Sequence, residues 1–253
     1  MFGFHLLRRL RKAALHEPVM TPQPDATDLK AINIAFVAEM TSRLPYEEAM
    51  QSAIGGGFEQ FGAVELAVLK HYGLPKDGHL VDVGCGSGRL ARPLAAWLTG
   101  TYLGVDLVPD LIKYARAIAA RPDWRFEVID HIGIPEVDEQ ADMVCFFSVL
   151  THLLHEQSYW YLEEARRVLK PGGTIVFSFL EFHEPGHLQI FLDTVANTKR
   201  RHLQPLNTFI ERGAIRVWAQ TLELEVIDIR DGGNAVGPEG ALGQSICVLR
   251  KTV

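Results

Sequence analysis

The 253-residue sequence predicts an α/β fold in which a doubly wound, mostly parallel β-sheet carries helices on both faces. Short apolar runs alternate with helical patterns between residues 79 and 179, and parallel strands need such helical crossovers. Two further apolar runs near the C-terminus have no helix between them, which predicts an antiparallel hairpin at the sheet edge. A glycine-rich turn follows the first apolar run, where a strand is expected to lead into a helix.

The first 16 residues predict a basic amphipathic helix. They carry four basic side chains, Arg8, Arg9, Arg11 and Lys12, and the apolar residues fall on one side of a helix. The charges lie in the middle of the segment, which is not the arrangement of a secretory signal. Such a helix either packs against its own domain or makes weak peripheral contact with an anionic membrane surface.

The next part of the chain is expected to be a linker followed by helices. Residues 18–28 are rich in proline, threonine and aspartate, which indicates a linker. Helical patterns then cover residues 28–51 and 61–71, and a run of three glycines lies between them. We therefore expect N-terminal helices, lid and linker over residues 1–60 and one larger domain over residues 61–253.

The larger domain contains the alternating elements. The apolar runs that predict strands are residues 79–83, 101–106, 125–129, 142–148, 174–179, 225–230 and 245–250. The patterns that predict helices are residues 89–98, 109–120, 156–169 and 209–222.

Composition limits the classes of function. Lysine and arginine number 25 against 31 acidic residues, so the formal charge is −6, which disfavours non-specific binding to nucleic acid. The cysteines Cys85, Cys145 and Cys247 lack the spacing of a disulfide framework or a zinc site, which indicates a reducing, cytoplasmic compartment and no metal. No apolar run approaches the roughly 20 residues that a membrane-spanning helix needs.

The glycine-rich turn reads VDVGCGSG over residues 81–88. Glycines let the chain turn tightly after a strand and let a ligand approach the peptide groups, and the following helix offers free N–H donors. A dinucleotide-binding turn has glycine at its sixth position, which is Arg89 here. The spacing GxGxG therefore argues against that class.

This turn resembles the first motif of the class I S-adenosylmethionine-dependent methyltransferases, in which an acidic residue precedes GxGxG. Later segments resemble further motifs of the family in the expected order, namely residues 102–106, 126–130, 141–148 and 167–174. The resemblance spans residues 81–179, and it implies a seven-stranded sheet in which the C-terminal hairpin supplies the last two strands. It also implies a variable N-terminal lid.

The resemblance implies S-adenosyl-L-methionine as the cofactor. It implies that Asp106 accepts hydrogen bonds from the ribose hydroxyls, and that Asp130 faces the adenine amino group with His131 beside the ring. The expected cofactor-binding residues are Asp82, Gly84, Cys85, Gly86, Gly88, Asp106, Leu107, Asp130, His131 and Ser148. Each acidic residue has a structural alternative as a helix cap or turn partner.

Methyl transfer to a hydroxyl requires an aligned acceptor, methyl group and sulfur, and a base that removes the proton. His152 is the candidate for this base, although in many relatives this position only begins a helix. His155, His183 and His187 are further candidates. The fourth strand lacks the Asn- or Asp-Pro-Pro-aromatic motif of amino-methylating family members. We therefore expect O-methylation of a small molecule, such as a metabolite or a sugar, without a metal ion.

Two other functions stay open at this point. The chain is alternatively a non-catalytic module that binds the cofactor or a partner, or an aminopropyl transferase that uses the decarboxylated cofactor. The segment 180–206 is expected to shape acceptor specificity, and its basic residues from Lys199 to His202 either end a helix or bind an anionic acceptor. The sequence assigns neither the acceptor nor the oligomeric state.

Overall fold

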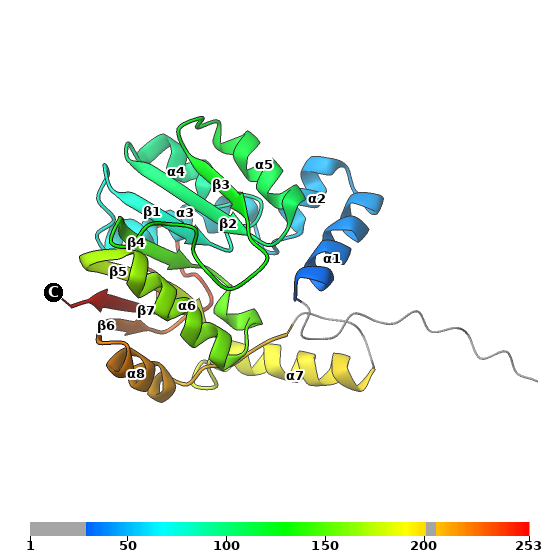
Figure 1. Cartoon of the computed structure of the whole chain (residues 1–253). Coiled ribbons are helices and arrows are strands. Elements are labelled where there is room, and N and C mark those ends of the chain that lie inside the picture. Colours follow the sequence, from blue (N-terminus) through cyan, green and yellow to red (C-terminus); the bar gives the residue numbers. More distant parts are fainter. Residues whose placement is uncertain (1–28, 201–205, 253) are drawn as a thin grey trace, which may run out of the picture.

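The computed structural model describes residues 29–200 and 206–252. Its centre is a seven-stranded sheet with the strand order β3-β2-β1-β4-β5-β7-β6 (Figure 1). The strands are β1 (His79–Val83), β2 (Thr101–Asp106), β3 (Arg125–Val128), β4 (Ala141–Phe146), β5 (Leu169–Phe179), β6 (Leu224–Arg230) and β7 (Ser245–Lys251). β1 to β5 run parallel, and β7 pairs antiparallel with both β5 and β6. The expected fold class and C-terminal hairpin are therefore confirmed.

The helices connect the strands and precede them. They are α1 (Leu29–Arg43), α2 (Tyr46–Ser52), α3 (Phe58–His71), α4 (Ala91–Trp97), α5 (Pro109–Ala119), the 3₁₀ turn η1 (Leu150–His152), α6 (His155–Val168), α7 (Pro185–Lys199) and α8 (Arg212–Thr221).

The side chains of the strands divide between two cores, because successive residues of a strand point to opposite faces of the sheet. Val81 and Val83 of β1 pack with the buried residues of α6 and α8. Leu80 packs on the other face with the buried residues of α3, α4 and α5. Helices on both faces leave the carboxyl ends of the parallel strands open at one edge, where sheets of this kind bind ligands.

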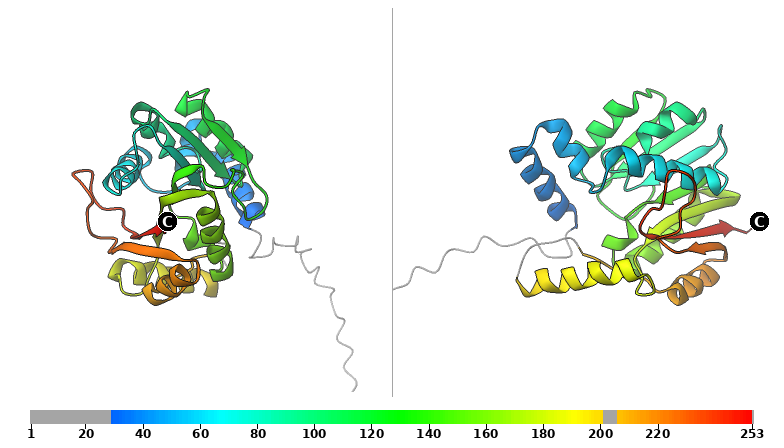
Figure 2. Two further views of the ribbon diagram at one scale, coloured as in Figure 1. Left: turned by 60° about the vertical axis from the view of Figure 1, so that its left-hand side comes forward. Right: turned by 180° about the vertical axis from the view of Figure 1, so that it is seen from behind.

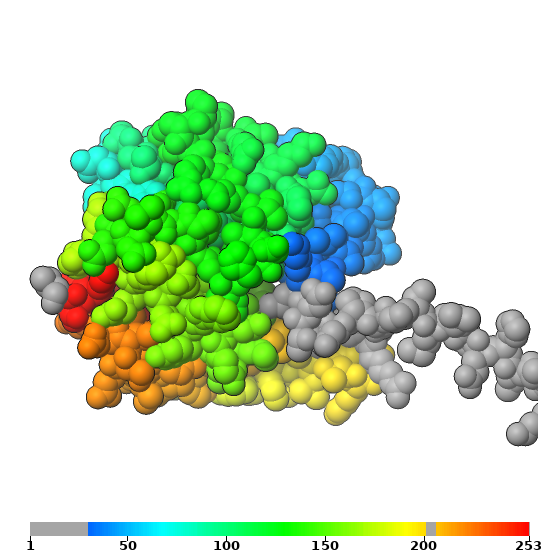
Figure 3. Space-filling model, in the orientation of Figure 1, coloured from blue at the N-terminus to red at the C-terminus, as the bar shows by residue number. Residues whose placement is uncertain are grey.

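The N-terminal helices form a third, smaller core beside α5. Val37 of α1 and Met50 of α2 pack with Leu111 and Tyr114 of α5. In the space-filling view, the blue surface of α1 and α2 abuts the green surface of the central part of the chain (Figure 3). The basic helix expected over residues 1–16 lies outside the described residues.

α7 is not predicted by the sequence pattern, and α8 begins later than that pattern predicts. Only His187 of α7 is buried, while Leu188, Phe191 and Leu192 are exposed, so the helix lacks a clear amphipathic pattern. Pro185 at its first position was the available signal. The helix expected from residue 209 starts at Arg212, because Phe209 forms a β-bridge with Leu180.

The two helices α1 and α7 lie toward the same side of the molecule in Figure 1 and in the view from behind in Figure 2. α7 follows the carboxyl end of β5 after a short connection. Within the described ranges, no helix is both long enough and apolar enough to span a bilayer.

Candidate active site

A cavity of about 240 Å³ lies at the carboxyl ends of β1, β2 and β4. Its lining comes from these strand ends and the end of β3, from α1 and the segment after α2, and from α5, η1 and α6: Asn33, Phe36, Ala53, Ile54, Val83, Gly84, Gly86, Asp106, Leu107, Val108, Leu111, Ile129, Phe147, Ser148, Val149, His152, Leu153 and Tyr161. Six of the expected site residues, Gly84, Gly86, Asp106, Leu107, Ser148 and His152, are among them. The cavity is thus mostly apolar with a few polar groups, which is typical of a small-molecule site.

The glycine-rich turn brings the backbone to the cavity wall. Gly84 and Gly86 have φ angles of 72° and 54°, a region that side chains disfavour. A Cβ atom at Gly84 would lie 2.4 Å from a methyl group of Val149, and one at Gly86 would lie 2.8 Å from a methyl group of Ile54. Only glycine fits both positions in this arrangement.

Asp106 ends β2 and fixes this turn. Its Oδ2 accepts a hydrogen bond from the N–H of Gly86 at 3.0 Å, and its Oδ1 accepts one from the N–H of Val108 at 2.9 Å. Burial raises the pKa of Asp106, and the backbone donors of Val108, Gly86 and Leu107 oppose that rise. A carboxylate has about four acceptor positions, so two bonds leave capacity for ligand hydroxyls.

Asp82 lies behind the turn rather than in the main cavity. The side chain is buried, accepts a hydrogen bond from the Tyr102 hydroxyl at 2.8 Å and contacts the Cys145 thiol at 3.5 Å. Burial raises its pKa to about 7. Asp82 and Cys85 line a separate small cavity of about 30 Å³ that shares Gly84 and Gly86 with the main one.

The shifted pKa of Asp82 predicts a pH-dependent stability. The carboxyl group of Asp82 ionises near 3.8 in the unfolded chain and near 7 in the folded chain, so folding takes up a proton between these values. Its contribution to stability is therefore full in acid and is lost as the pH rises through about 7. Thermal melts between pH 5 and pH 8 should show a steeper fall in Tm for the wild type than for Asp82→Asn. Parallel Tm curves for the two proteins would contradict this interpretation.

Three expected residues lie outside both cavities. The side chains of Asp130 and His131 are 73% and 74% exposed, and they pair with each other at 2.8 Å. This pairing lowers the pKa of Asp130. Gly88 is buried where α4 meets α5, because a Cβ there would lie 2.9 Å from Ala115. In this arrangement none of the three contacts the cavity.

His152 and Ser148 lie on the cavity side of β4. The Nδ1 atom of His152 lies 2.6 Å from the carbonyl oxygen of Leu206, and burial lowers the pKa of the imidazole. Ser148 has a φ of 59°, and its N–H donates to the Ser178 hydroxyl at 2.7 Å. A non-glycine residue in this region is strained, and such strain is common at functional sites.

Several cavity residues are not predicted by the sequence motifs. Asn33, Phe36 and Ile54 come from the N-terminal helices, which approach the strand ends only in the folded chain. Tyr161 comes from the buried face of α6. Its spacing of four residues from the buried Ala165 was the available signal.

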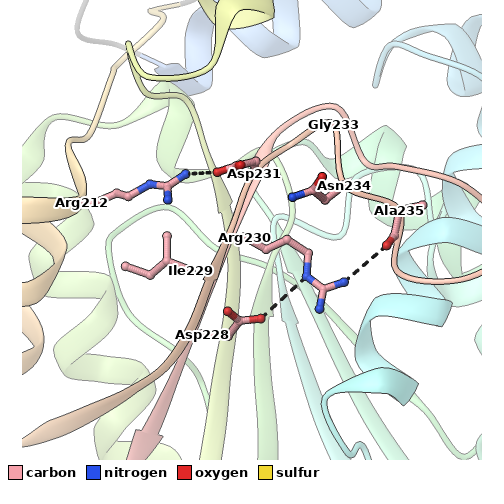
Figure 4. Close-up of a pocket in the computed structure, with 8 residues that line it drawn as sticks. All are labelled: Arg212, Asp228, Ile229, Arg230, Asp231, Gly233, Asn234 and Ala235. Atoms are coloured by element: carbon pink, nitrogen blue, oxygen red, sulfur yellow. Dashed lines mark hydrogen bonds and ion pairs between the residues drawn. The ribbon is translucent and has the colours of Figure 1, made fainter.

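Another cavity, of about 580 Å³, lies between α8 and the end of β6 (Figure 4). Its charged groups already have protein partners. Arg212 pairs with Asp231 and with the buried Glu181, and Arg230 lies 3.7 Å from Asp228. This network fastens α8 to the C-terminal hairpin and leaves no charged side chain of the lining unpaired within the described ranges.

The chain matches known methyltransferases in sequence. Residues 80–173 match a family model described as a methyltransferase domain. The ubiquinone biosynthesis O-methyltransferase of Methylobacterium nodulans is 33% identical over 117 residues, which cover 42% of this chain and 45% of that protein. The malonyl-acyl-carrier protein O-methyltransferase of Hahella chejuensis is 31% identical over 125 residues, covering 49% of this chain and 43% of that protein. The chain therefore spans less than half the length of these curated relatives.

The fold comparison agrees. A magnesium protoporphyrin IX methyltransferase from Synechocystis PCC 6803, solved with bound S-adenosylhomocysteine, matches with a TM-score of 0.63 at 16% identity. The match covers 90% of this chain and 100% of that one. At this identity it shows a shared fold.

The main cavity suits an adenosyl cofactor. The glycine turn lets a ligand reach the backbone, Asp106 offers a carboxylate to hydroxyl groups, and Leu107 and Ile129 supply apolar walls for a flat ring. Ser87 Oγ and Arg89 Nε, both at the turn, are buried without a partner among the described residues. S-adenosyl-L-methionine is the cofactor that this fold and this family model imply. Fold, family model and cavity agree: residues 80–173 match a methyltransferase domain, and the chain has the sheet and the strand-end cavity expected from its resemblance to the class I S-adenosylmethionine-dependent methyltransferases.

Proposed function

We propose that this protein transfers a methyl group from S-adenosyl-L-methionine to a hydroxyl group of a small molecule. The observation that carries the proposal is that the ends of β1 and β2, with the glycine turn and Asp106, line one cavity together with the partly buried His152. The names of the two curated relatives, both O-methyltransferases, support an oxygen acceptor.

The cofactor residues have separate roles in this proposal. Asp106 accepts hydrogen bonds from the ribose hydroxyls, while Gly84 and Gly86 allow the methionyl part to lie against the backbone. The bound cofactor supplies an electrophilic methyl group on a sulfonium. The roles of Asp130 and His131 at the adenine stay predictions, since both side chains are exposed and pair with each other.

His152 is the proposed general base. Its Nδ1 is held by the Leu206 carbonyl oxygen, which can only accept, so the proton resides on Nδ1 and the lone pair on Nε2. Because burial lowers its pKa, the imidazole is neutral near pH 7 and can take the acceptor proton. His155 is exposed, its Nε2 contacts the Phe209 carbonyl oxygen, and it does not line the cavity, so it is the weaker candidate.

An aromatic cluster includes Phe209, which follows Leu206, the residue that contacts His152, by three positions in the chain. The rings of Phe182 and Phe209 stack at 4.6 Å, and Phe191 of α7 packs edge-on against both. Phe182 is 48% exposed and Phe191 is 36% exposed. We propose that this cluster borders the acceptor entrance and favours an acceptor with an apolar or aromatic part.

The N-terminal helices act in this proposal as a lid. Asn33 and Phe36 of α1 and Ile54 after α2 close the cavity from outside, and Arg89 Nη1 ties the turn to the Gly55 carbonyl oxygen at 3.1 Å. The three buried free thiols and the net negative charge support a cytoplasmic enzyme that does not act on nucleic acid.

The proposed function is tested with cell extract as the source of acceptors, so that the acceptor does not have to be chosen beforehand. The full chain is incubated with S-adenosylmethionine carrying a labelled methyl group and with fractionated cell extract, and products are identified by mass. A small-molecule product with the label on oxygen is expected. Label found on nitrogen, on nucleic acid or on no product would contradict the proposal.

A further inference from the structure

Tyr161 is a buried polar residue that the expected cofactor contacts do not use. It is 5% exposed and lines the main cavity from α6. Within residues 29–200 and 206–252, its hydroxyl has no hydrogen-bond partner. The oxygen is not among the described polar atoms that are both enclosed and unpaired, so it is open to the cavity. A hydroxyl that faces a cavity and has no protein partner is free to hydrogen-bond a ligand atom placed there.

The hydroxyl remains a hydrogen-bond donor at physiological pH. Burial and, second, the charge of Asp106 raise the pKa of Tyr161 to about 12. Tyr161 and Asp106 both line the main cavity. An edge contact with the Phe146 ring, at 5.8 Å between centroids, holds the Tyr161 ring in place.

The position of α6 tells which part of the cofactor Tyr161 meets. Glu164, three residues further along α6, accepts a hydrogen bond from the N–H of Ile134 at 3.2 Å, so this side of the helix packs over the segment after β3. Ile129, the first residue after β3, lines the cavity together with Tyr161. Tyr161 therefore lies toward the β3 side of the cavity.

Neighbouring strands of the sheet are expected to contact successive parts of the cofactor. β1 supplies the glycine turn, β2 supplies Asp106 for the ribose, and β3 is the next strand outward. The base follows the ribose in an adenosyl group, so the β3 side receives the adenine. The acidic residue expected there, Asp130, is 73% exposed and pairs with His131. Tyr161 is thus a polar side chain of the cavity lining on this side.

We propose that the Tyr161 hydroxyl donates a hydrogen bond to a ring nitrogen of the adenine and so contributes to selection of an adenosyl cofactor. This inference rests on the proposed binding of S-adenosylmethionine in the main cavity. In this proposal, a side chain of α6 recognises the adenine ring.

Isothermal titration of the full chain with S-adenosylhomocysteine tests the inference. Tyr161→Phe removes only the hydroxyl, and we expect Kd to rise roughly 3- to 10-fold, the usual effect of losing one hydrogen bond. Tyr159→Phe is the matched control on the same helix, because Tyr159 packs against Trp218 and does not line the cavity. Its Kd should equal that of the wild type. Equal melting temperatures of the three proteins check that the fold is intact.

Analogues of S-adenosylhomocysteine locate the contact. The 1-deaza, 3-deaza and 7-deaza forms each replace one ring nitrogen by carbon, and the difference between wild type and Tyr161→Phe should vanish for one of them. A difference that persists for all three, or that vanishes only for a 2′-deoxyribose analogue, would overturn the inference. Equal affinity of wild type and Tyr161→Phe for the parent compound would also overturn it. Absence of binding by the wild type would instead reject the proposed function.

Discussion

Replacing His152 with glutamine is expected to lower kcat for methyl transfer by about 10²- to 10⁴-fold, the usual contribution of a general base. The dissociation constant for S-adenosylhomocysteine should stay unchanged, because the proposed role of His152 is to take a proton from the acceptor hydroxyl. The loss of kcat is expected because the Leu206 carbonyl oxygen accepts a hydrogen bond from Nδ1 at 2.6 Å, which leaves the lone pair of Nε2 to accept the proton. The measurement is the rate of label transfer to the product found with cell extract.

The pH dependence of the same reaction gives a second readout. Burial lowers the pKa of His152 below its usual 6.5, so the wild-type rate should rise from acid pH and level off near neutrality. The rate of His152→Gln should not show this rise from acid to neutral pH. His155→Ala is the matched control, since His155 is exposed and does not line the cavity, and it should retain both rate and profile. A His152→Gln protein with the wild-type rate would remove this residue from the mechanism.

Replacing Asp106 with alanine should weaken binding of S-adenosylhomocysteine by about 1–3 kcal/mol, or roughly 5- to 150-fold. The carboxylate has two tasks in this account. It accepts the ribose hydroxyls, and it holds the glycine turn through the N–H groups of Gly86 and Val108. Isothermal titration with the purified full chain measures the loss.

Two further variants separate these tasks. Asp106→Asn keeps one acceptor oxygen for the turn but removes the charge, so it should bind more weakly than the wild type and more tightly than Asp106→Ala. Asp110→Ala is the control, because Asp110 lies exposed in the first turn of α5 and outside the cavity. An Asp106→Ala protein with wild-type affinity would show that this carboxylate does not contact the cofactor.

The sequence predicts the central sheet well because its strands are bounded by strong local signals. β1 and β2 begin and end at the predicted residues, since each is an apolar run next to glycine or an acidic residue. α7 has no such signal inside it, because most of its apolar residues are exposed and only His187 is buried. Its position became evident only from the folded chain.

The candidate site is predictable in its backbone and less so in its side chains. Gly84, Gly86 and Asp106 follow from motif spacing, because a strand end fixes where the backbone lies. The direction of Asp82 depends on the neighbouring strand, where Tyr102 offers a buried hydroxyl that no local pattern reveals. Asp130 lies beyond the end of β3, where the alternation of a strand no longer fixes the direction of a side chain.

The central claim is that the strand ends of β1 and β2 form an adenosyl-binding cavity. Isothermal titration of the wild-type chain with S-adenosylhomocysteine tests it most directly. The account predicts one site per chain with a dissociation constant on the order of micromolar, as is common for enzymes and their small ligands. Absence of binding heat and of any thermal stabilisation at millimolar ligand would contradict it.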